Sequence, residues 1–475
     1  MVGTSAEAVQ PVVEALLAEQ DAIRARLDAF LRLPSVSADP AFAEGMRDAR
    51  AFLLDWLRAI GLSDVRLLDG GGQPAVYGAW DGAPGRPTLL IYGHYDVQPP
   101  APSNRWRSDP FEPTERDGKL YARGASDVKG STTIALETVA AFLRVTGGCP
   151  VNVRFFLEGE EETGSPSLRE IIRRHAPLLR ADAVLSADGG RASPTIPTLN
   201  VGARGIAAVE IALRSATKEL HSGRYGGAVR NALHEMARLV ASLHEEDGRI
   251  AVSGFLDDLH SPTPRQREEA AAVPLDEAAF CAEVGASPLG EPGYILRERL
   301  TLRPAIDVNG MWGGYTGAGG KTVIPDEAFA KITMRLGPGQ SPERAIRCLS
   351  DHLTRRCPAG VQIRIAPGAG GAEAFELAEN HPLRRAGAVT LERLTGQAPL
   401  PVRLGATVPI TAVFKETLGI DTLMFGFNLP DEDVHAPNEF FRLESIPAGL
   451  RGWSMLLAEL GEMTEADFRP FRTAV

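Results

Sequence analysis

Four short apolar runs, most of them ending in polar residues, constrain the fold of this chain more than any other feature. They are TLLIYGHYDV (88–97), VNVRFFLEGE (151–160), ADAVLSADGG (181–190) and DTLMFGF (421–427). Such runs are typical of strands buried on both faces of a mostly parallel sheet. Helical stretches such as 131–145 fall between them, so the sequence predicts an α/β fold in which helices flank a mostly parallel sheet.

The middle of the chain follows a different pattern. It contains strand 206–213, helix 226–243, a long Pro- and Gly-containing stretch, strand 328–336, helix 341–357 and strand 361–367. This order resembles a ferredoxin-like unit. Because the buried-strand pattern resumes near residue 421, and because 475 residues exceed what one core supports, we predict two domains. The first is discontinuous (1–203 and 372–475), and an α+β lid or dimerisation domain (204–371) is inserted into it.

Charge and composition exclude several classes of protein. A net charge of −11 opposes binding to a phosphate backbone, so we expect no nucleic-acid partner. No apolar run reaches eighteen residues, which argues against a membrane span. Residues 1–39 are predicted to be an acidic amphipathic helix without the features of an export signal. The cysteines suit neither a disulfide framework nor a zinc ribbon, which favours a cytoplasmic protein with reduced thiols at Cys149, Cys281, Cys348 and Cys357.

Side chains that can bind metal follow the predicted strands. The carboxyl ends of parallel strands open on one crevice, so residues far apart in the sequence should converge there. One strand-end histidine is, by itself, more often structural, and a run such as EGEEETGS is usually a solvated loop. Together, however, five carboxylates in one crevice would repel each other unless cations compensated them. The residues concerned are His94, Asp96, Asp127, Glu161, Glu162, Asp188 and His435.

The types of these side chains indicate which metal they would hold. Oxygen ligands alone would suit magnesium or calcium, whereas two imidazoles with carboxylates favour zinc, manganese or cobalt. Zinc is the first choice. The set is larger than one tetrahedral ion needs, which suggests two ions about 3.5–4 Å apart that share one carboxylate.

Five motifs resemble a family of di-zinc metallopeptidases that includes carnosinase, cytosolic nonspecific dipeptidase, aminoacylase and succinyl-diaminopimelate desuccinylase. In order they are GHYDVQP, WRSDPF with DGKLYARGASDVKGS, EGEEETGS, HSGRYGG and HAPNE. The dipeptidase branch is the most similar. The chain departs from the pattern at Val128, where many relatives have Asp or Met, and at Ala232, where Pro is common. The resemblance also implies a cis peptide bond after Asp127.

The resemblance implies the metal ligands residue by residue. Asp127 would bridge the two ions. His94 and Asp188 would complete one site, and Glu162 and His435 would complete the other.

Two further acids receive roles from the same resemblance. Glu161 would be the general base, which takes a proton from the water held between the ions and delivers it to the leaving amine. Asp96 would orient the ring of His94. The spacing agrees, because residues two apart on a strand point to the same side.

The inserted domain contributes the predicted substrate contacts. His221, in HSGRYGG, would stabilise the oxyanion, commonly in the active site of the partner subunit, although by sequence alone it could equally cap a turn. Arg335 would bind the substrate carboxylate, a task that suits a guanidinium. Thr322 and Thr407 fall where the family contacts substrate. For Arg335, Thr322 and Thr407 the alternative is a strand-surface or turn residue.

The predicted activity is hydrolysis of the amide bond of dipeptides or similar small substrates with a free carboxylate. A homodimer formed through the inserted domain is expected. An N-acyl-amino-acid deacylase or desuccinylase would have the same metal site, so the motifs leave that alternative open. A non-catalytic metal-binding scaffold is a second alternative, and the presence of Glu161 argues against it. Phosphate-ester hydrolysis lacks support, because the chain has no glycine loop of the Walker type.

Overall fold

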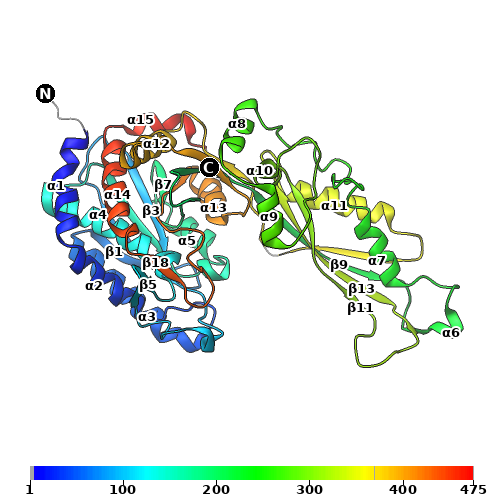
Figure 1. Cartoon of the computed structure of the whole chain (residues 1–475). Coiled ribbons are helices and arrows are strands. Elements are labelled where there is room, and N and C mark those ends of the chain that lie inside the picture. Colours follow the sequence, from blue (N-terminus) through cyan, green and yellow to red (C-terminus); the bar gives the residue numbers. More distant parts are fainter. Residues whose placement is uncertain (1–4, 369, 474–475) are drawn as a thin grey trace. The chain divides into compact units, whose positions relative to one another are not determined.

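The computed structural model describes residues 5–368 and 370–473 (Figure 1). The chain forms two compact units. Unit 1 contains residues up to 201 together with 377–402 and 413–475, and unit 2 contains 202–376 and 403–412. The predicted boundaries, 203/204 and 371/372, lie close to these. The segment 403–412 differs, because it belongs to unit 2 and not to the first domain.

Unit 1 is built on a six-stranded sheet in the order β1-β2-β6-β3-β7-β17. Strands β6, β3, β7 and β17 are parallel to one another, and β1 and β2 add an antiparallel edge. The prediction of an α/β fold with a mostly parallel central sheet is therefore confirmed. The strands are β1 (Ser63–Leu68), β2 (Ala75–Trp80), β3 (Thr88–His94), β6 (Asn152–Glu158), β7 (Ala183–Ser186) and β17 (Thr422–Met424).

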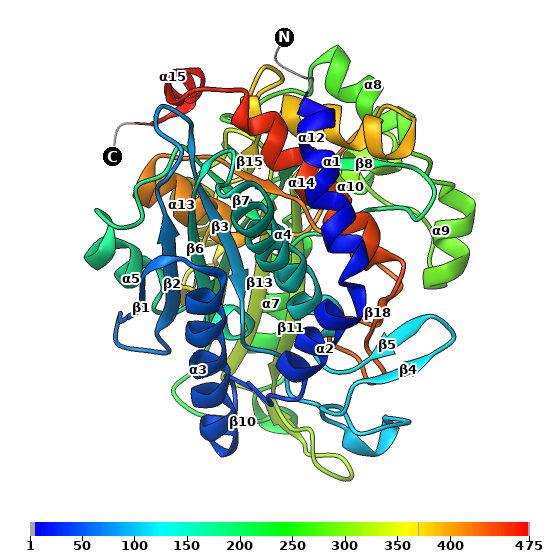
Figure 2. The same ribbon diagram turned by 90° about the vertical axis from the view of Figure 1, so that its left-hand side faces the viewer.

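Helices cover both faces of this sheet (Figure 2). On one face α4 (Gly130–Thr146) lies so close that a Cβ at Gly93 would come within 2.6 Å of the Thr132 hydroxyl. On the other face Phe414, from α13 (Pro409–Leu418), packs against Tyr92 at 5.6 Å between ring centroids. The remaining helices of unit 1 are α1 (Ser5–Ala18), α2 (Gln20–Leu31), α3 (Ala43–Ile60), α5 (Leu168–His175), α12 (Pro382–Thr395), α14 (Ser445–Gly461) and α15 (Glu465–Phe468).

The N-terminal segment departs from the prediction of one helix over 1–39. The chain forms two helices, α1 and α2, separated by a turn at Glu19, whose ψ of 17° departs from helical geometry. Residues 1–4 of the predicted helix lie outside the described residues. Splitting the segment lets α1 pack on α14 and α4 while α2 also reaches α4, so both apolar faces are buried.

A small antiparallel sheet in unit 1 brings two distant segments together. In it β18 (Phe440–Arg442) pairs with β5 (Lys119–Tyr121), which also pairs with β4 (Thr114–Arg116). The residues just before β18 and just after β5 are consequently neighbours. These are the segments that contain His435 and Asp127.

Unit 2 contains a four-stranded antiparallel sheet in the order β11-β13-β9-β14. With α7 between β9 and β11 and α11 between β13 and β14, this is the ferredoxin-like order that the sequence predicts. Alternate residues of β9 and β13 are buried against the two helices. The elements are β9 (Gly205–Arg214), α7 (Ala232–Ala241), β11 (Ala305–Gly313), β13 (Glu327–Leu336), α11 (Pro342–Arg356) and β14 (Gln362–Pro367).

Two details of unit 2 differ from the prediction. Helix α7 begins after Asn231, whose side chain accepts the Leu233 amide at 2.9 Å, and not at Gly226. This N-cap fixes the start of the helix. Strand β11 lies in a stretch that the sequence pattern treats as irregular. The other elements are β10 (Leu220–His221), α6 (Ser222–Tyr225), α8 (Pro264–Ala272), α9 (Glu277–Val284), α10 (Leu296–Thr301), β12 (Val323–Ile324), and the strands near the unit boundaries, β8 (Thr198–Ala203), β15 (Phe375–Glu376) and β16 (Leu400–Leu404).

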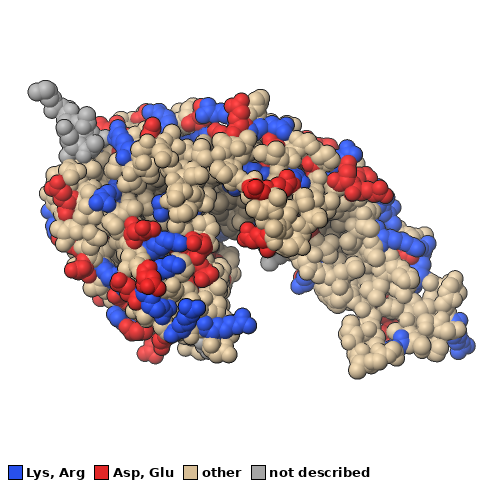
Figure 3. Space-filling model, in the orientation of Figure 1, with Lys and Arg blue, Asp and Glu red and all other residues tan. Residues whose placement is uncertain are grey.

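Among the described helices, none combines the length and apolar character that crossing a membrane requires. Positive and negative side chains are interspersed over most of the face shown in Figure 3. No basic stripe of the kind that attracts nucleic acid is visible on that face.

Candidate metal centre

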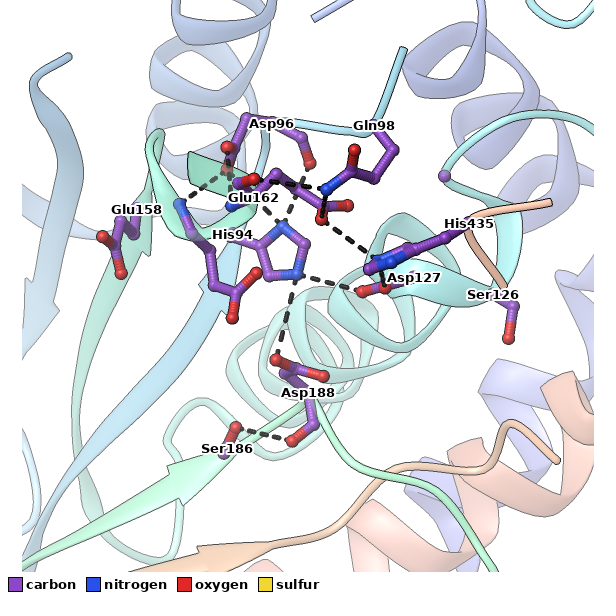
Figure 4. A network of polar contacts seen from close by, with 12 residues as sticks. His94, Asp96, Gln98, Ser126, Asp127, Glu158, Glu162, Ser186, Asp188 and His435 are labelled. Atoms are coloured by element: carbon purple, nitrogen blue, oxygen red, sulfur yellow. Dashed lines mark hydrogen bonds and ion pairs between the residues drawn. The ribbon is translucent and has the colours of Figure 1, made fainter. Parts of the chain in front are cut away.

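The five predicted ligands, each from a separate segment, converge at the carboxyl ends of the parallel strands of unit 1 (Figure 4). His94 is the last residue of β3, and Asp188 lies two residues after β7. Glu161 and Glu162 begin a short 3₁₀ turn after β6, rather than lying at the end of the strand itself. This convergence follows from parallel strands that open on one edge of the sheet.

Two groups of side chains share Asp127. In the first group, His94 Nε2 is 3.1 Å from Asp127 Oδ1 and 3.9 Å from Asp188 Oδ2. In the second group, His435 Nε2 is 2.9 Å from Asp127 Oδ2 and 3.1 Å from Glu162 Oε2. Within each group the ligand atoms lie within 4.8 Å of one another. Asp127 therefore presents one oxygen to each group. The peptide bond between Asp127 and Val128 is cis.

The geometry and the donor types fit two divalent ions. Ligands about 2.1 Å from a tetrahedral ion are separated from each other by about 3.4 Å, and the distances above scatter around that value. Each group combines one imidazole nitrogen with two carboxylates, a donor set that suits zinc, manganese or cobalt better than magnesium or calcium. The residues could thus hold one ion per group, with Asp127 between them.

Without cations the centre is electrostatically unbalanced. Burial raises the pKa of Glu161 to about 8 and that of Asp188 to about 6, and neighbouring carboxylates add to both shifts. Hydrogen bonds to Asp127 and Glu162 raise the pKa of His435 to about 10. Burial alone would lower the pKa of His94, but contacts with Asp127 and Asp96 outweigh it and raise that pKa well above its usual value. Divalent ions would replace these protons and balance the charge.

Asp96 lies beside His94, and its carboxylate has further partners besides the predicted one. His94 Nδ1 is 3.0 Å from the main-chain oxygen of Asp96 and 3.5 Å from its carboxylate. The carboxylate also accepts the amides of Glu161 at 3.3 Å and Glu162 at 3.1 Å, and the Ser37 hydroxyl at 2.7 Å. Both the backbone oxygen and the carboxylate of Asp96 therefore face the imidazole, and the carboxylate also fixes the acidic turn.

Two neighbours of the centre are not among the predicted site residues. Gln98 Nε2 donates to Glu162 Oε2 at 2.8 Å and to the Glu162 main-chain oxygen at 3.2 Å, which holds this carboxylate towards His435. Gln98 lies inside the quoted motif GHYDVQP, so the motif itself contained the signal. Ser37 comes from the N-terminal region, and no pattern in the sequence singles it out.

Glu161 lies close to the ligands but belongs to neither group among the described residues. Its carboxyl group interacts electrostatically with His94, Asp188, Asp127 and Glu162, which places it in the same cluster. A carboxylate that is near the ions and is not needed as a ligand is free to move a proton.

His221 and Thr322 are neighbours in unit 2. β10 pairs with β12, and the Ser222 amide donates to the Thr322 carbonyl at 3.0 Å. His221 is exposed, and its Nδ1 accepts the Gly223 amide at 3.0 Å. A nitrogen that accepts an N–H carries no proton, so in the neutral ring Nε2 is the donor. His221 thus caps a turn and still presents a donor.

Arg335 and Thr407 contact each other in unit 2, although they are 72 residues apart. Arg335 Nη1 donates to the Thr407 hydroxyl at 2.8 Å. This contact is one of several that join the segment 403–412 to the rest of unit 2.

Comparisons with known proteins decide the family of this chain. Residues 90–459 match the model of peptidase family M20/M25/M40. The chain belongs to this family. It is therefore an enzyme, a metallopeptidase, and the resemblance stated from the motifs is confirmed. The alternative of a non-catalytic scaffold was wrong.

Within the family the chain is similar to proteins of the dipeptidase branch and to a solved metallo-carboxypeptidase. It is 27% identical to the Cys-Gly metallodipeptidase dug1 of Schizosaccharomyces pombe, over 94% of this chain and 97% of that protein. It is 26% identical to the Beta-Ala-His dipeptidase of Mus musculus, with 92% of each chain covered. The solved M20 metallo-carboxypeptidase Sso-CP2 from Sulfolobus solfataricus matches with a TM-score of 0.80 and 30% identity, over 93% of this chain and 99% of that one.

A buried acid under the centre leads to a prediction about pH. Glu158, which pairs with His94 across the sheet, is 1% exposed and accepts the Tyr92 hydroxyl at 2.8 Å. Burial raises its pKa from 4.5 to about 7, although hydrogen bonds from Ser165 and Tyr92 oppose the shift. The folded protein thus prefers neutral Glu158. This contribution to stability is fully present below pH 4.5 and is lost as the pH rises through 7.

Glu158→Gln should remove this dependence, because glutamine has a similar shape and does not titrate. Relative to the variant, the free energy of unfolding of the wild type should fall by about 3 kcal/mol between about pH 4.5 and pH 8. Urea unfolding of the metal-free proteins measures this difference. Parallel pH curves for the two proteins would contradict it.

Proposed function

We propose that this chain hydrolyses the peptide bond of dipeptides that carry a free carboxylate, with two zinc ions held by the two groups that share Asp127. The observation that carries the proposal is the pair of ligand groups with Glu161 beside them. The similarity to a Cys-Gly metallodipeptidase and a Beta-Ala-His dipeptidase over more than nine tenths of the chain supports dipeptides as substrates. Manganese or cobalt would also suit the donor set.

In this proposal the protein's own residues perform the proton transfers. The bound ions would acidify a water molecule and polarise the scissile carbonyl. Glu161 accepts the proton of the attacking water and returns it to the leaving nitrogen. The Asp96 carboxylate holds the backbone amides of Glu161 and Glu162, so the base and a ligand keep fixed positions relative to each other. Gln98 selects the direction of the Glu162 carboxylate.

Unit 2 supplies the proposed contacts to substrate. Nε2 of His221 would donate to the developing oxyanion, because Nδ1 is already occupied by the Gly223 amide. Arg335 would bind the substrate carboxylate through the part of its guanidinium that does not contact Thr407. Thr407 fixes the direction of that guanidinium, and Thr322 anchors the turn of His221.

We also propose a homodimer formed through unit 2. Strand β11 is an edge strand, and its edge offers unpaired backbone groups to another strand. Large apolar side chains are exposed on β11 and just after it: Val308, Met311, Trp312 and Tyr315 are 40–47% exposed. The part of unit 2 around β11 is largely uncharged on the face shown in Figure 3. Such a surface favours a protein partner, and a second copy of the chain is the simplest one.

A cytoplasmic location is proposed from the cysteines. Cys149, Cys281, Cys348 and Cys357 are all free thiols. Free thiols without disulfides are usual in a reducing compartment.

A substrate panel combined with metal analysis tests the proposed function. The purified protein should retain two divalent ions per chain. It should cleave dipeptides with a free carboxylate and lose most of this activity on the same dipeptides with an amidated C-terminus, because Arg335 then lacks its anionic partner. Chelation should abolish the activity, and zinc should restore it.

Other outcomes of the panel would overturn specific parts of the proposal. Cleavage of N-acetyl or N-succinyl amino acids alone would favour the deacylase alternative. Material that binds no divalent ion under any condition would remove the metal centre itself.

A further inference from the structure

A buried ion pair beside the metal centre takes no part in the proposed chemistry. Arg123 and Glu439 are each 1% exposed, and Arg123 Nη1 donates to Glu439 Oε2 at 2.6 Å. Glu439 closes the HAPNE motif, and Arg123 lies in the motif that contains Asp127. We propose that this pair positions Asp127 and His435 relative to each other, so that Asp127 can serve both ligand groups. The inference rests on the proposed two-metal site.

Glu439 holds the turn that presents Asp127. Its Oε1 accepts the amides of Ser126 at 3.0 Å and Asp127 at 3.1 Å, while Oε2 accepts the Gly124 amide at 3.1 Å. With Arg123 these contacts fill the acceptor positions of the carboxylate. One side chain thus fixes three amides of a single turn, including the amide of the shared ligand. Hydrogen bonds to a carboxylate are stronger than those to a neutral acceptor, which suits such a fixed turn.

Arg123 connects the same pair to the segment of His435 and to the segment that follows His94. Its Nη2 is 3.3 Å from the carbonyl oxygen of His435 and 3.3 Å from that of Pro99. Pro99 follows the segment that contains His94 and Asp96. The ion pair therefore contacts the backbone of segments that meet only in the folded protein, since Arg123 and Glu439 are 316 residues apart.

The loop before Glu439 has a conformation that needs such anchors. Asp433, His435 and Asn438 have φ values of 50°, 65° and 69°, in the left-handed region that non-glycine residues rarely occupy. Such residues persist where surrounding contacts determine them. The carbonyl of His435 is held by Arg123, and the Asn438 side chain accepts the Arg107 amide at 2.9 Å. Without these contacts the His435 ring would lose its defined direction.

General stabilisation is a weaker explanation for this pair. A buried ion pair recovers little more than the cost of removing two charges from water, so replacing both partners by apolar residues is often neutral for stability. Apolar residues could not form the hydrogen bonds that Arg123 and Glu439 make with the backbone of the segments containing the metal ligands. Arg123 and Glu439 are therefore positioning residues for the metal centre.

A second ion pair in unit 1, with a buried carboxylate and a half-buried arginine, provides the control. Glu137 is 3% exposed and accepts from Arg26 Nη2 at 2.7 Å. The pair joins α2 to α4. Glu137→Gln disturbs a buried carboxylate and its arginine without touching a segment that contains a ligand. It therefore reports the general effect of such a change on the fold.

The test is a titration of chelator-treated protein with Co²⁺, in which calorimetry measures the affinity and visible absorption the ligand geometry. Glu439→Gln should bind Co²⁺ about 10- to 100-fold more weakly than the wild type and show an altered absorption spectrum, as expected when a partner of a ligand is lost. Glu137→Gln should keep the affinity and spectrum of the wild type, whatever its unfolding temperature. Wild-type affinity and spectrum in Glu439→Gln would overturn the inference, and so would equal losses in both variants.

A second variant keeps the inference testable if Glu439→Gln does not fold. Arg123→Lys retains a cation beside Glu439 but removes the guanidinium nitrogen that reaches the His435 carbonyl. It should weaken the binding of one of the two ions, and unchanged binding of both would overturn the inference. A wild type that binds no Co²⁺ would instead contradict the proposed function, so the two failures are distinguishable.

Discussion

Glu161→Ala should lose about 10²- to 10⁴-fold in kcat towards a dipeptide while keeping both metal ions. The reason is the division of roles between adjacent glutamates. The Glu162 carboxylate lies 3.1 Å from His435 Nε2 and belongs to a ligand group, whereas Glu161 belongs to neither group. Removing Glu161 thus removes the proton acceptor without opening a coordination position. Initial rates with a cleaved dipeptide, together with elemental analysis of the same sample, measure both quantities.

Glu160 provides the matched control for this prediction. It directly precedes Glu161 in the same acidic run, but its carboxylate accepts the amides of Gln73 at 2.8 Å and Ser167 at 3.1 Å and stays outside the centre. Glu160→Gln should therefore change kcat far less than Glu161→Ala. Near-normal turnover in Glu161→Ala would remove Glu161 from the mechanism, and loss of metal from that variant would assign it a ligand role instead.

The sequence predicts the strands of the central sheet, because their burial on both faces requires runs of apolar residues. The runs at 88–97 and 151–160 contain β3 and β6 because strands covered on both faces need continuous apolar residues. Since such strands are parallel, their ends meet, and the grouping of His94, Asp188 and Glu162 near one edge follows from the topology alone. The position of Asp127 does not follow from the parallel sheet. It depends on the pairing of β5 with β18, two strands of three residues each, which are too short to give a clear pattern in the sequence.

The sequence does not predict two kinds of feature: side-chain contacts with main-chain groups, and strands whose side chains are partly exposed. The Asp96 carboxylate binds main-chain amides of the acidic turn, and such amides are present at every residue, so no residue type marks them. Strand β11 lacks an alternating apolar pattern because it lies at the edge of its sheet, with Met311 and Trp312 each 47% exposed. The segment 403–412 lies in unit 2, where Thr407 contacts Arg335 across 72 residues, and no local pattern in the sequence signals such a distant contact.

Two inactive variants should regain activity when they are mixed. Glu161 lies in unit 1, and His221 lies in unit 2. If His221 serves the active site of the partner subunit, a mixed dimer of His221→Ala and Glu161→Ala contains one site with both residues intact. Random exchange of equal amounts makes half of the dimers mixed, each with one working site of two, so about a quarter of wild-type activity should return. Each variant alone should remain strongly impaired, by about 10²- to 10³-fold for the loss of one oxyanion donor.

The control for this experiment is the same mixture without subunit exchange. If the variants are combined under conditions that keep dimers intact, activity should stay at the sum of the separate proteins and rise only after exchange is induced. If His221 instead acts within its own chain, every site in a mixed dimer lacks one of the two residues. Mixing would then restore no activity. A mixture that stays inactive after demonstrated exchange would therefore place His221 in the active site of its own subunit or remove it from the mechanism. A chain that sediments as a monomer at the assay concentration would exclude action across a subunit boundary altogether.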